Sequence, residues 1–243
     1  MKENAIELLD ATLRRKRKKC MIGTGSMSDP YMPLESELRY TRKAMELVYK
    51  YGFGMTVLTK SDAIMRDIDL IEAINKKTKF VVQTTLTTVD GELCKKIEPN
   101  VCPTADRVKM LIAMRERGIP TVVWLCPILP FINDTEENIN GIIDSCIAAG
   151  VYGIINFGMG LTLRDGNREY FYAMLDRHFP SIKERYIQRF GNSYECASPD
   201  NGRLMRLLRE RCRKSGIVCD NDKIFAYLHE FPDRNGYEQL RLF

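Results

Sequence analysis

Short runs of β-forming residues alternate with helical patterns from residue 20 to residue 157, and this alternation constrains the fold more than any other feature. The expected strands are five apolar runs: Met21–Ile22, Met55–Leu58, Phe80–Leu86, Thr121–Leu125 and Tyr152–Phe157. The expected helices lie between them, at Glu37–Tyr51, Asp69–Lys77, Thr104–Arg117 and Glu136–Ala149. Strands joined by helical crossovers form a parallel sheet with right-handed connections. The sequence therefore predicts an α/β fold.

A further helix, predicted over Glu3–Lys19, comes before the first strand. A series of strand–helix units that begins with a helix lacks the strand of its first unit. Adding that unit gives six, so we expect a partial (β/α)6 TIM-like barrel with parallel strands and the first strand missing. The strand at Cys20–Gly23 would then have an unpaired edge, and such an edge favours pairing with another chain. We therefore expect a homo-oligomer through this edge.

The pattern changes after Phe157, where strand–helix alternation stops. We expect residues 1–160 to form the barrel and residues 161–243 to form a C-terminal helical extension packed on it. The extension is predicted to contain a helical stretch over Phe171–Phe190 that is broken at Pro180, a basic helix at Gly202–Ser215, and a last helical segment at Ile217–Leu228.

The composition excludes several classes of protein. Hydrophobic residues make up 44% and charged residues 28%, which is ordinary for a globular domain. We see neither an apolar run of membrane-spanning length nor a signal peptide, so we expect a cytoplasmic protein without a membrane partner. The two histidines, His178 and His229, both lie beside aromatic residues. We therefore expect neither a His-based metal site nor a Ser-His-Asp triad.

The eight cysteines are scattered and include no Cys-x2-Cys pair, which argues against zinc ribbons and thioredoxin-like sites. Cys126 and Cys146 lie in apolar segments and are expected to be buried thiols. Cys212 and Cys219 are close in sequence, but a disulfide between them would be unusual in a reducing compartment. We assign no metal ligand.

Ligands of parallel sheets bind where the strands end, and small polar residues follow several of the predicted strands. The stretch from Gly23 to Glu35 is rich in glycine and hydroxyl residues and leads into a helix, where backbone N–H groups point outward. This set suits a polar, zwitterionic ligand better than acid–base hydrolysis, which needs paired carboxylates. The predicted cofactor-binding residues are Thr24, Gly25, Ser26, Ser28, Asp29, Lys60, Thr84, Thr85, Asn156 and Gly158, and we assign no catalytic residue.

Each of these residues also has a purely structural interpretation. Ser28-Asp29-Pro30 is typical of a turn. Lys60 fits a solvated surface lysine, and Thr84 and Thr85 are ordinary strand residues. Their occurrence along one expected rim favours a common site.

Four motifs carry a resemblance to a known family. They are Asp29-Pro30-Tyr31-x-Pro33-x-Glu35, Thr59-Lys60-Ser61, Glu98-Pro99 with Pro103 and Arg107, and the terminal Gln239-Leu240-x-Leu242-Phe243. In this order they resemble the spore photoproduct lyase-like (DNA repair photolyase-like) group of the radical S-adenosylmethionine (radical SAM) superfamily. The resemblance extends over essentially the whole chain, from about residue 3 to residue 243.

The resemblance implies two cofactors, S-adenosylmethionine (AdoMet) and a [4Fe–4S] cluster held by three cysteines. In such enzymes one electron cleaves the bound AdoMet to a 5′-deoxyadenosyl radical, which abstracts a hydrogen from the substrate. The resemblance also implies that Thr24–Ser28 lie near the methionyl amine, Thr84 and Thr85 near the ribose and carboxylate, and Asn156–Gly158 near the adenine. It suggests DNA lesion repair as the reaction class.

One element of the family pattern is missing, because the sequence contains no Cys-x3-Cys-x2-Cys segment. Thiolate ligation of the cluster is not optional, so we expect this polypeptide, whether shortened or a degenerate copy, to bind no cluster and to be inactive by itself.

Two alternatives stay open. The basic runs Arg14–Lys19 and Arg203–Lys214 favour a cluster-free nucleic-acid-binding or scaffold protein that retains the barrel. Cations that end a helix, however, also suit the helix dipole, and this explains the first run without any ligand. The other alternative is a barrel lyase that uses Lys60 as a Schiff-base amine.

Overall fold

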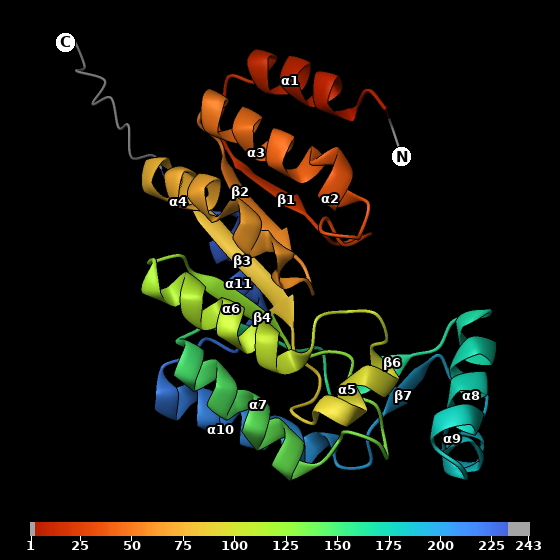
Figure 1. Ribbon diagram of the computed structural model, residues 1–243. Coiled ribbons are helices and arrows are strands. Elements are labelled where there is room, and N and C mark those ends of the chain that lie inside the picture. The colour runs from red at the N-terminus through yellow and green to blue at the C-terminus, as the bar shows by residue number, and fades with distance from the viewer. Residues whose placement is uncertain (1–2, 233–243) are drawn as a thin grey trace.

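A five-stranded parallel sheet forms the centre of the protein, as the computed structural model of residues 3–232 shows (Figure 1). The strands follow one another in the order in which they occur in the chain: β1 (Met21–Thr24), β2 (Gly54–Leu58), β3 (Phe80–Thr85), β4 (Thr121–Trp124) and β5 (Gly153–Ile155). All four pairings are parallel. This confirms the predicted α/β class and the partial TIM-like barrel. The terminal motif at Gln239–Phe243 lies outside the described residues.

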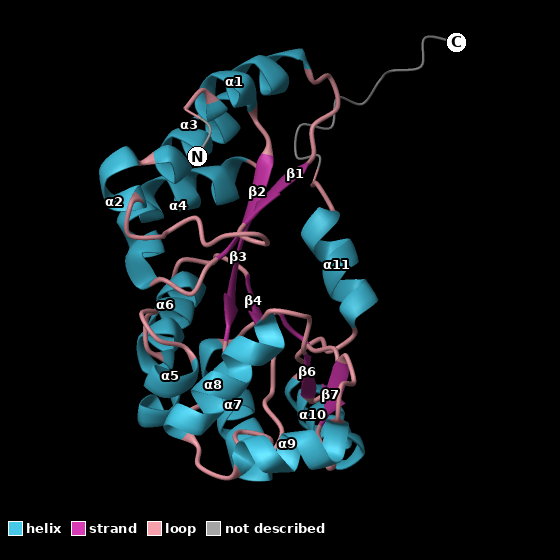
Figure 2. Cartoon of the chain, turned by 90° about the vertical axis from the view of Figure 1, so that its right-hand side faces the viewer, coloured by secondary structure: helices cyan, strands magenta, loops and turns pink. Residues whose placement is uncertain are grey.

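One face of the sheet, the convex face, is covered by a layer of helices (Figure 2). These helices are α1 (Ala5–Arg15), α2 (Glu35–Leu38), α3 (Tyr40–Tyr51), α4 (Ile68–Lys77), α6 (Thr104–Glu116) and α7 (Glu136–Ala149). Their apolar faces and the convex side chains of the strands share the largest hydrophobic cluster. As predicted, Gly52 and Gly150 cap α3 and α7 with positive φ angles of 68° and 59°.

The helix predicted over Glu37–Tyr51 is broken at Arg39, whose φ of 51° is left-handed. The cause is Glu35, whose carboxylate accepts hydrogen bonds from the backbone N–H groups of Tyr40 (2.9 Å) and Thr41 (2.8 Å). A side chain five residues upstream thus caps α3 and forces the chain to turn. The leading helix is also shorter than predicted, since α1 ends at Arg15, before most of the basic run.

Two short elements, one after β2 and one after β3, were not predicted from the sequence. They are the 3-10 helix η1 (Asp62–Asp67) and the helix α5 (Gly91–Ile97), of six and seven residues. Neither is long enough to show a helical repeat of apolar residues.

The chain leaves the parallel sheet after β5, forms a separate small unit, and then returns to the sheet. This small unit consists of the antiparallel pair β6 (Gly160–Thr162) and β7 (Glu195–Ala197) with α8 (Asn167–His178) and α9 (Ile182–Phe190), and it has its own hydrophobic cluster. Next, α10 (Asn201–Ser215) packs against α7 (Figure 1). The sequence predicted no strand in this region, because β6 and β7 are too short to show a strand pattern.

The last helix, α11 (Asn221–His229), lies on the concave face of the sheet, opposite the helical layer (Figure 2). The segment before it pairs with β5, since Val218 forms a parallel bridge to Gly153. From there Ile224 and Leu228 pack against strand residues that include Val81. The amine of Lys79 donates to the carbonyl oxygens of Tyr227 (2.5 Å) and Glu230 (3.2 Å) and so fixes the far end of α11. The concave face is therefore filled at its amino-terminal half.

The two edges of the sheet differ. Within the described residues β1 pairs with β2 alone, whereas β5 also contacts the segment around Val218. The oligomer expected through the β1 edge stays a prediction. In residues 3–232 we find no helix with the length and apolar character needed to cross a bilayer.

Candidate functional site

The carboxyl ends of the strands form a rim, and most of the predicted site residues lie along it. Side chains alternate between the two faces of a strand, so Gln83 and Thr85 share the concave face with Val81, while Thr84 shares the convex face with Val82. Val81 packs against α11, and Val82 belongs to the cluster under the helical layer. The structure therefore separates Thr84 from the concave side of the rim. Its hydroxyl is fully buried and has no partner in the described part of the chain.

The loop after β1 is held tightly against the end of β2. Gly25 has a φ of 102°, and a Cβ atom added there would lie 2.0 Å from the carbonyl oxygen of Leu58. Only glycine permits this approach. Ser26 and Ser28 follow on the exposed side of the loop, and their hydroxyls have no hydrogen-bond partner among residues 3–232. These hydroxyls are free to contact a ligand.

Asp29 is fully engaged within the protein. One carboxylate oxygen accepts from the N–H of Tyr31 (2.8 Å) and the hydroxyl of Thr59 (2.6 Å), and the other accepts from the N–H of Lys60 (2.8 Å). Asp29 thus joins the loop after β1 to the end of β2. It positions the rim and has little capacity left for a ligand.

Lys60 begins a chain of ionic contacts that runs along the rim. Its amine lies 2.5 Å from one oxygen of Glu98, and the other oxygen of Glu98 accepts from Arg107 at 2.7 Å. Arg107, which is 0% exposed, also donates to the carbonyl oxygens of Thr85 (2.6 Å) and Cys102 (2.7 Å). The end of β2, the end of β3 and the start of α6 are joined in this way.

The charge state of Glu98 follows from these contacts. Burial by itself would raise the pKa of Glu98, but the charges of Lys60 and Arg107 outweigh burial and lower it. Glu98 is therefore a carboxylate paired with the Lys60 amine. This ion pair holds the amine in place at the rim, so the geometry disfavours a Schiff-base role for Lys60.

The remaining residues of the first motif form a second buried network beside η1. The hydroxyl of Tyr31 donates to Asp67 at 3.0 Å, and both Arg42 and Arg66 pair with that carboxylate. Burial, followed by the charge of Asp67, raises the pKa of Tyr31, so it stays a phenol. Asp29 and Tyr31 of the first motif, with Thr59 and Lys60 of the second, thus fix the loop after β1.

Asn156, at the end of β5, is also occupied. Its amide donates to the carbonyl of Leu125 (2.5 Å), and its side-chain oxygen accepts from the N–H of Gly158 (2.7 Å). The side chain of Asn221 exchanges two further hydrogen bonds with the Asn156 backbone (3.2 and 2.9 Å). Asn156 shapes the loop that carries Gly158, whose φ is 101°.

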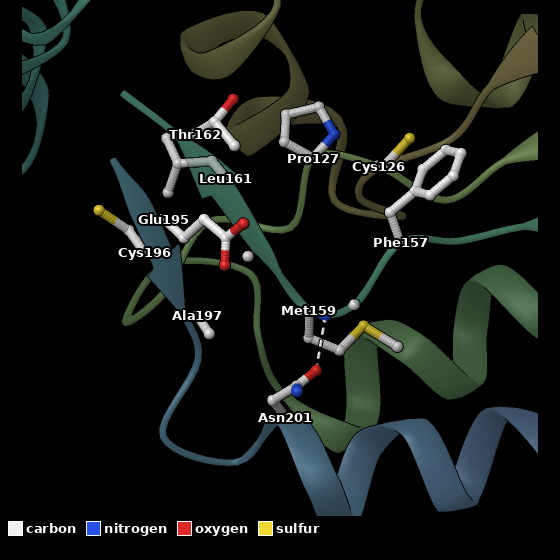
Figure 3. Close-up of a pocket in the computed structure, with 12 residues that line it drawn as sticks. Cys126, Pro127, Phe157, Met159, Leu161, Thr162, Glu195, Cys196, Ala197 and Asn201 are labelled. Atoms are coloured by element: carbon white, nitrogen blue, oxygen red, sulfur yellow. Dashed lines mark hydrogen bonds between the residues drawn. The ribbon is translucent and has the colours of Figure 1, made fainter. Parts of the chain in front are cut away.

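A pocket of about 680 Å³ opens beside this loop, between the ends of β4 and β5 and the β6–β7 pair (Figure 3). Its wall is mostly apolar. Phe157 is 65% exposed at its edge, and Glu195 is the only carboxylate among the lining residues. Burial raises the pKa of Cys126, at the end of β4, to about 11, so this thiol stays protonated.

Sequence analysis missed the far wall of this pocket. Asn201, at the start of α10, accepts a hydrogen bond from the N–H of Met159 at 2.8 Å and fixes the loop after β5 (Figure 3). Glu195 lies on β7. No local signal marks either residue, because they reach the pocket only through the return of the chain after α9.

The described residues do not fit an iron–sulfur cluster. Within residues 3–232 no group of three or more His, Cys, Asp or Glu side chains is arranged to hold a metal ion. At the loop after β1 the rim offers free hydroxyls and a close backbone approach, and the largely apolar pocket lies at the ends of β4 and β5.

No family model matches the sequence. A search of curated proteins finds an uncharacterized protein of Mycobacterium tuberculosis that is 27% identical over 191 residues, covering 78% of this chain and 56% of that protein. It also finds a radical SAM Nalpha-GlyT isomerase of Pseudomonas phage M6, 23% identical over 166 residues, covering 68% of this chain and 31% of the isomerase. The chain thus spans about half the length of the mycobacterial relative.

Among solved structures, spore photoproduct lyase complexed with dinucleoside spore photoproduct superposes with a TM-score of 0.59. The match covers 87% of this chain and 63% of the lyase, at 11% sequence identity. Another solved form of that lyase contains bound AdoMet. At this identity the likeness concerns the fold alone, and it shows that the chain has a radical SAM-like fold.

Proposed function

We propose that this chain is an AdoMet-binding core of the radical SAM type. One observation carries the proposal: the loop Thr24–Ser28 presents free hydroxyls at the carboxyl rim. The polar residues around the loop, by contrast, form hydrogen bonds with one another that hold the loop in place. A loop whose position is fixed by such hydrogen bonds suits recognition of a small zwitterion. The radical SAM-like fold and the phage isomerase relative support AdoMet as that ligand.

We propose different tasks for the predicted residues. Ser26 and Ser28, with Thr24 behind them, are the groups proposed to contact AdoMet, and the pocket beside Gly158 is proposed to take its adenine. Asp29, Lys60 and Asn156 position these loops instead. When AdoMet is bound to a reduced cluster, it supplies the carbon radical of these enzymes. The described residues offer no cluster ligands, so we propose that this polypeptide by itself binds AdoMet without cleaving it.

Calorimetric titration of the chain with AdoMet tests the proposal. We expect saturable binding, and we expect the double variant Ser26→Ala/Ser28→Ala to weaken it, since each lost hydrogen bond is worth about 1 kcal/mol. Ser215→Ala, at the distant end of α10, is the matched control.

Absence of binding in the folded wild-type chain would refute AdoMet recognition. Formation of 5′-deoxyadenosine after anaerobic reconstitution with iron and sulfide would refute the statement that the chain does not cleave AdoMet.

A second candidate function, nucleic-acid binding, is favoured by one feature of α10. Arg209 and Arg213 lie one turn apart and line a groove of about 770 Å³ together with Lys223 of α11; we call it the α10 groove. None of these three cations has an ion-pair partner within residues 3–232. By contrast, Arg203 and Arg211 on the same helix pair with Glu136 and Asp144 of α7. The carboxylates of Asp220 and Asp222 also line this groove. Cations without an ion pair along one groove suit the phosphates of a nucleic acid.

Salt dependence of oligonucleotide affinity tests this candidate. Phosphate contacts give a linear fall of log affinity with log salt concentration, with a slope close to the number of phosphates neutralised. We expect oligonucleotide binding by the wild-type chain to show such a slope, set by the cations of the α10 groove. Weak binding with a flat salt response would remove the candidate.

A further inference from the structure

The β6–β7 pair presents one acidic side chain, that of Glu195, to the pocket at the ends of β4 and β5. Across the pair, Thr162 lies opposite Glu195 and Gly160 lies opposite Ala197. Because side chains alternate between the two faces of a strand, these four residues share one face, and all four line the pocket. The side chain of Cys196 points the other way, into the hydrophobic cluster of the small unit (Figure 3). The fold thus aims Glu195 into the pocket.

The carboxylate of Glu195 has no hydrogen-bond or ion-pair partner within residues 3–232. Two other carboxylates of the rim differ in this respect. Asp29 accepts three hydrogen bonds, and Glu98 pairs with both Lys60 and Arg107. Glu195 therefore keeps the acceptor capacity that those two carboxylates have already used.

Two further groups of the pocket are available to a ligand. The ring of Phe157 packs against Trp124 and Phe225, with centroids 6.1 and 6.4 Å away, and still leaves 65% of the residue exposed. Asn201 uses its side-chain oxygen for the N–H of Met159, whereas its amide nitrogen has no partner in the described chain. The pocket thus offers a flat apolar surface, a carboxylate acceptor and an amide donor.

We propose that Glu195 selects a ligand whose aromatic ring carries an exocyclic amine, and this inference rests on the proposed function for the identity of that ligand. In AdoMet the amine is the 6-amino group of adenine. A carboxylate only accepts hydrogen bonds, so a ligand that fills this mostly apolar pocket has to donate one. Without a donor, the carboxylate loses water and gains nothing in return. Carboxylates accept hydrogen bonds from the exocyclic amine of a base in the same way in nucleic-acid complexes.

The other groups complement this contact. The ring nitrogen beside the 6-amino group of adenine is an acceptor, which suits the free amide of Asn201, and the purine ring stacks on Phe157. Glu195 and Asn201 both belong to the part of the chain that follows the small unit's helices. The base is therefore selected by the returning chain, while the loop after β1 contacts the methionyl end.

Calorimetric titration with two pairs of ligands tests the role of Glu195. One pair is AdoMet and its analogue with hydrogen in place of the 6-amino group, and the other is adenosine and purine riboside, which differ in the same way. We expect the wild-type chain to bind the aminated member of each pair about tenfold more tightly, as one hydrogen bond to a charged group provides. Glu195→Leu should abolish this preference. Glu195→Gln, which keeps an acceptor oxygen, should retain part of it.

Two further variants separate selection from general effects on the pocket. Glu169→Leu removes an exposed carboxylate from α8, outside the pocket, and should leave both affinity ratios unchanged. Phe157→Leu should weaken the two members of each pair alike, because it removes the stacking surface and leaves the acceptor in place.

The outcomes distinguish this inference from the proposed function. If AdoMet binds but its analogue binds equally well, or if the preference survives in Glu195→Leu, the role of Glu195 is overturned and AdoMet recognition stands. If AdoMet does not bind but adenosine shows a preference that depends on Glu195, the proposed function fails and the selection by Glu195 stands. A folded chain that binds neither AdoMet nor adenosine would overturn both.

Discussion

The two ends of the rim use their charged side chains in opposite ways. Over β1–β3, Asp29, Lys60, Glu98 and Arg107 satisfy one another in a continuous network with little capacity for a ligand. On α10, Arg209 and Arg213 line a groove and have no partners in the described chain. The difference shows that a conspicuous charged motif can serve to position a loop, whereas unpaired charges mark a surface open to contact. Four predictions test this division, beginning with the largest effect.

Replacement of Arg107 should be the most damaging change. Arg107→Met leaves the buried Glu98 carboxylate without one of its two ionic partners and removes the donor to Thr85, so we expect a loss of about 3–5 kcal/mol in the free energy of unfolding. Chemical denaturation measures it. Arg203→Met is the matched control on α10, where an exposed pair is worth about 0–1 kcal/mol. Equal losses in the two variants would contradict the division.

Two glycine-to-alanine variants distinguish the effect of a steric clash from the effect of backbone strain. Gly25→Ala meets the Leu58 carbonyl, and Gly166→Ala, at a φ of 79°, meets no atom within 4 Å. We expect Gly166→Ala to cost about 1 kcal/mol through backbone strain, and Gly25→Ala to cost more and to abolish AdoMet binding. Thermal unfolding and calorimetry measure the two quantities. If Gly25→Ala retains full affinity, the close approach of this loop is not part of the site.

Acid should weaken the network on β1–β3 selectively. The pKa of Glu98 is lowered in the folded protein, so the stability it contributes is present above the unfolded-state pKa of about 4.3 and is lost as the pH falls through the lower folded value. We expect the free energy of unfolding to decline below about pH 5, and Glu98→Gln to show a smaller decline. Denaturation at a series of pH values measures this. An identical pH profile for the two proteins would show that Glu98 is not the group responsible.

The smallest effect on stability should come from the α10 groove. Arg209→Gln/Arg213→Gln removes charges without partners, so we expect the free energy of unfolding to stay within about 0.5 kcal/mol of the wild type. The same variant should reduce the salt slope of oligonucleotide binding by about two. Arg203→Gln/Arg211→Gln should keep the slope, because those charges are already paired. The reverse pattern would assign nucleic-acid contact to the other side of α10.

The sequence predicted the sheet well because the signals there are local. The strand runs are apolar and alternate with helical segments, as a parallel sheet requires, and glycines such as Gly150 mark helix ends. Elements that depend on distant contacts were missed. The break at Arg39 follows from the carboxylate of Glu35, and β6 and β7 exist as strands only because residues more than thirty positions apart pair.

The candidate site was predicted in position but not in detail. Parallel strands end at one rim, so the spacing placed Ser26, Lys60, Thr85 and Gly158 there. Which of these residues is free depends on partners far along the chain, such as Glu98 for Lys60. The pocket wall at Glu195 depends on the return of the chain to the sheet after α9.

The placement of α11 has a consequence for synthesis of the protein. Residues 221–229 cover strands that were made as early as residue 21, so the concave face stays uncovered until this late helix has left the ribosome. Until then the nascent chain exposes Val81, Val122 and Ile155 to other molecules, which is a hazard for aggregation. Docking of α11, to which Lys79 donates two hydrogen bonds, is therefore the step that covers this apolar surface.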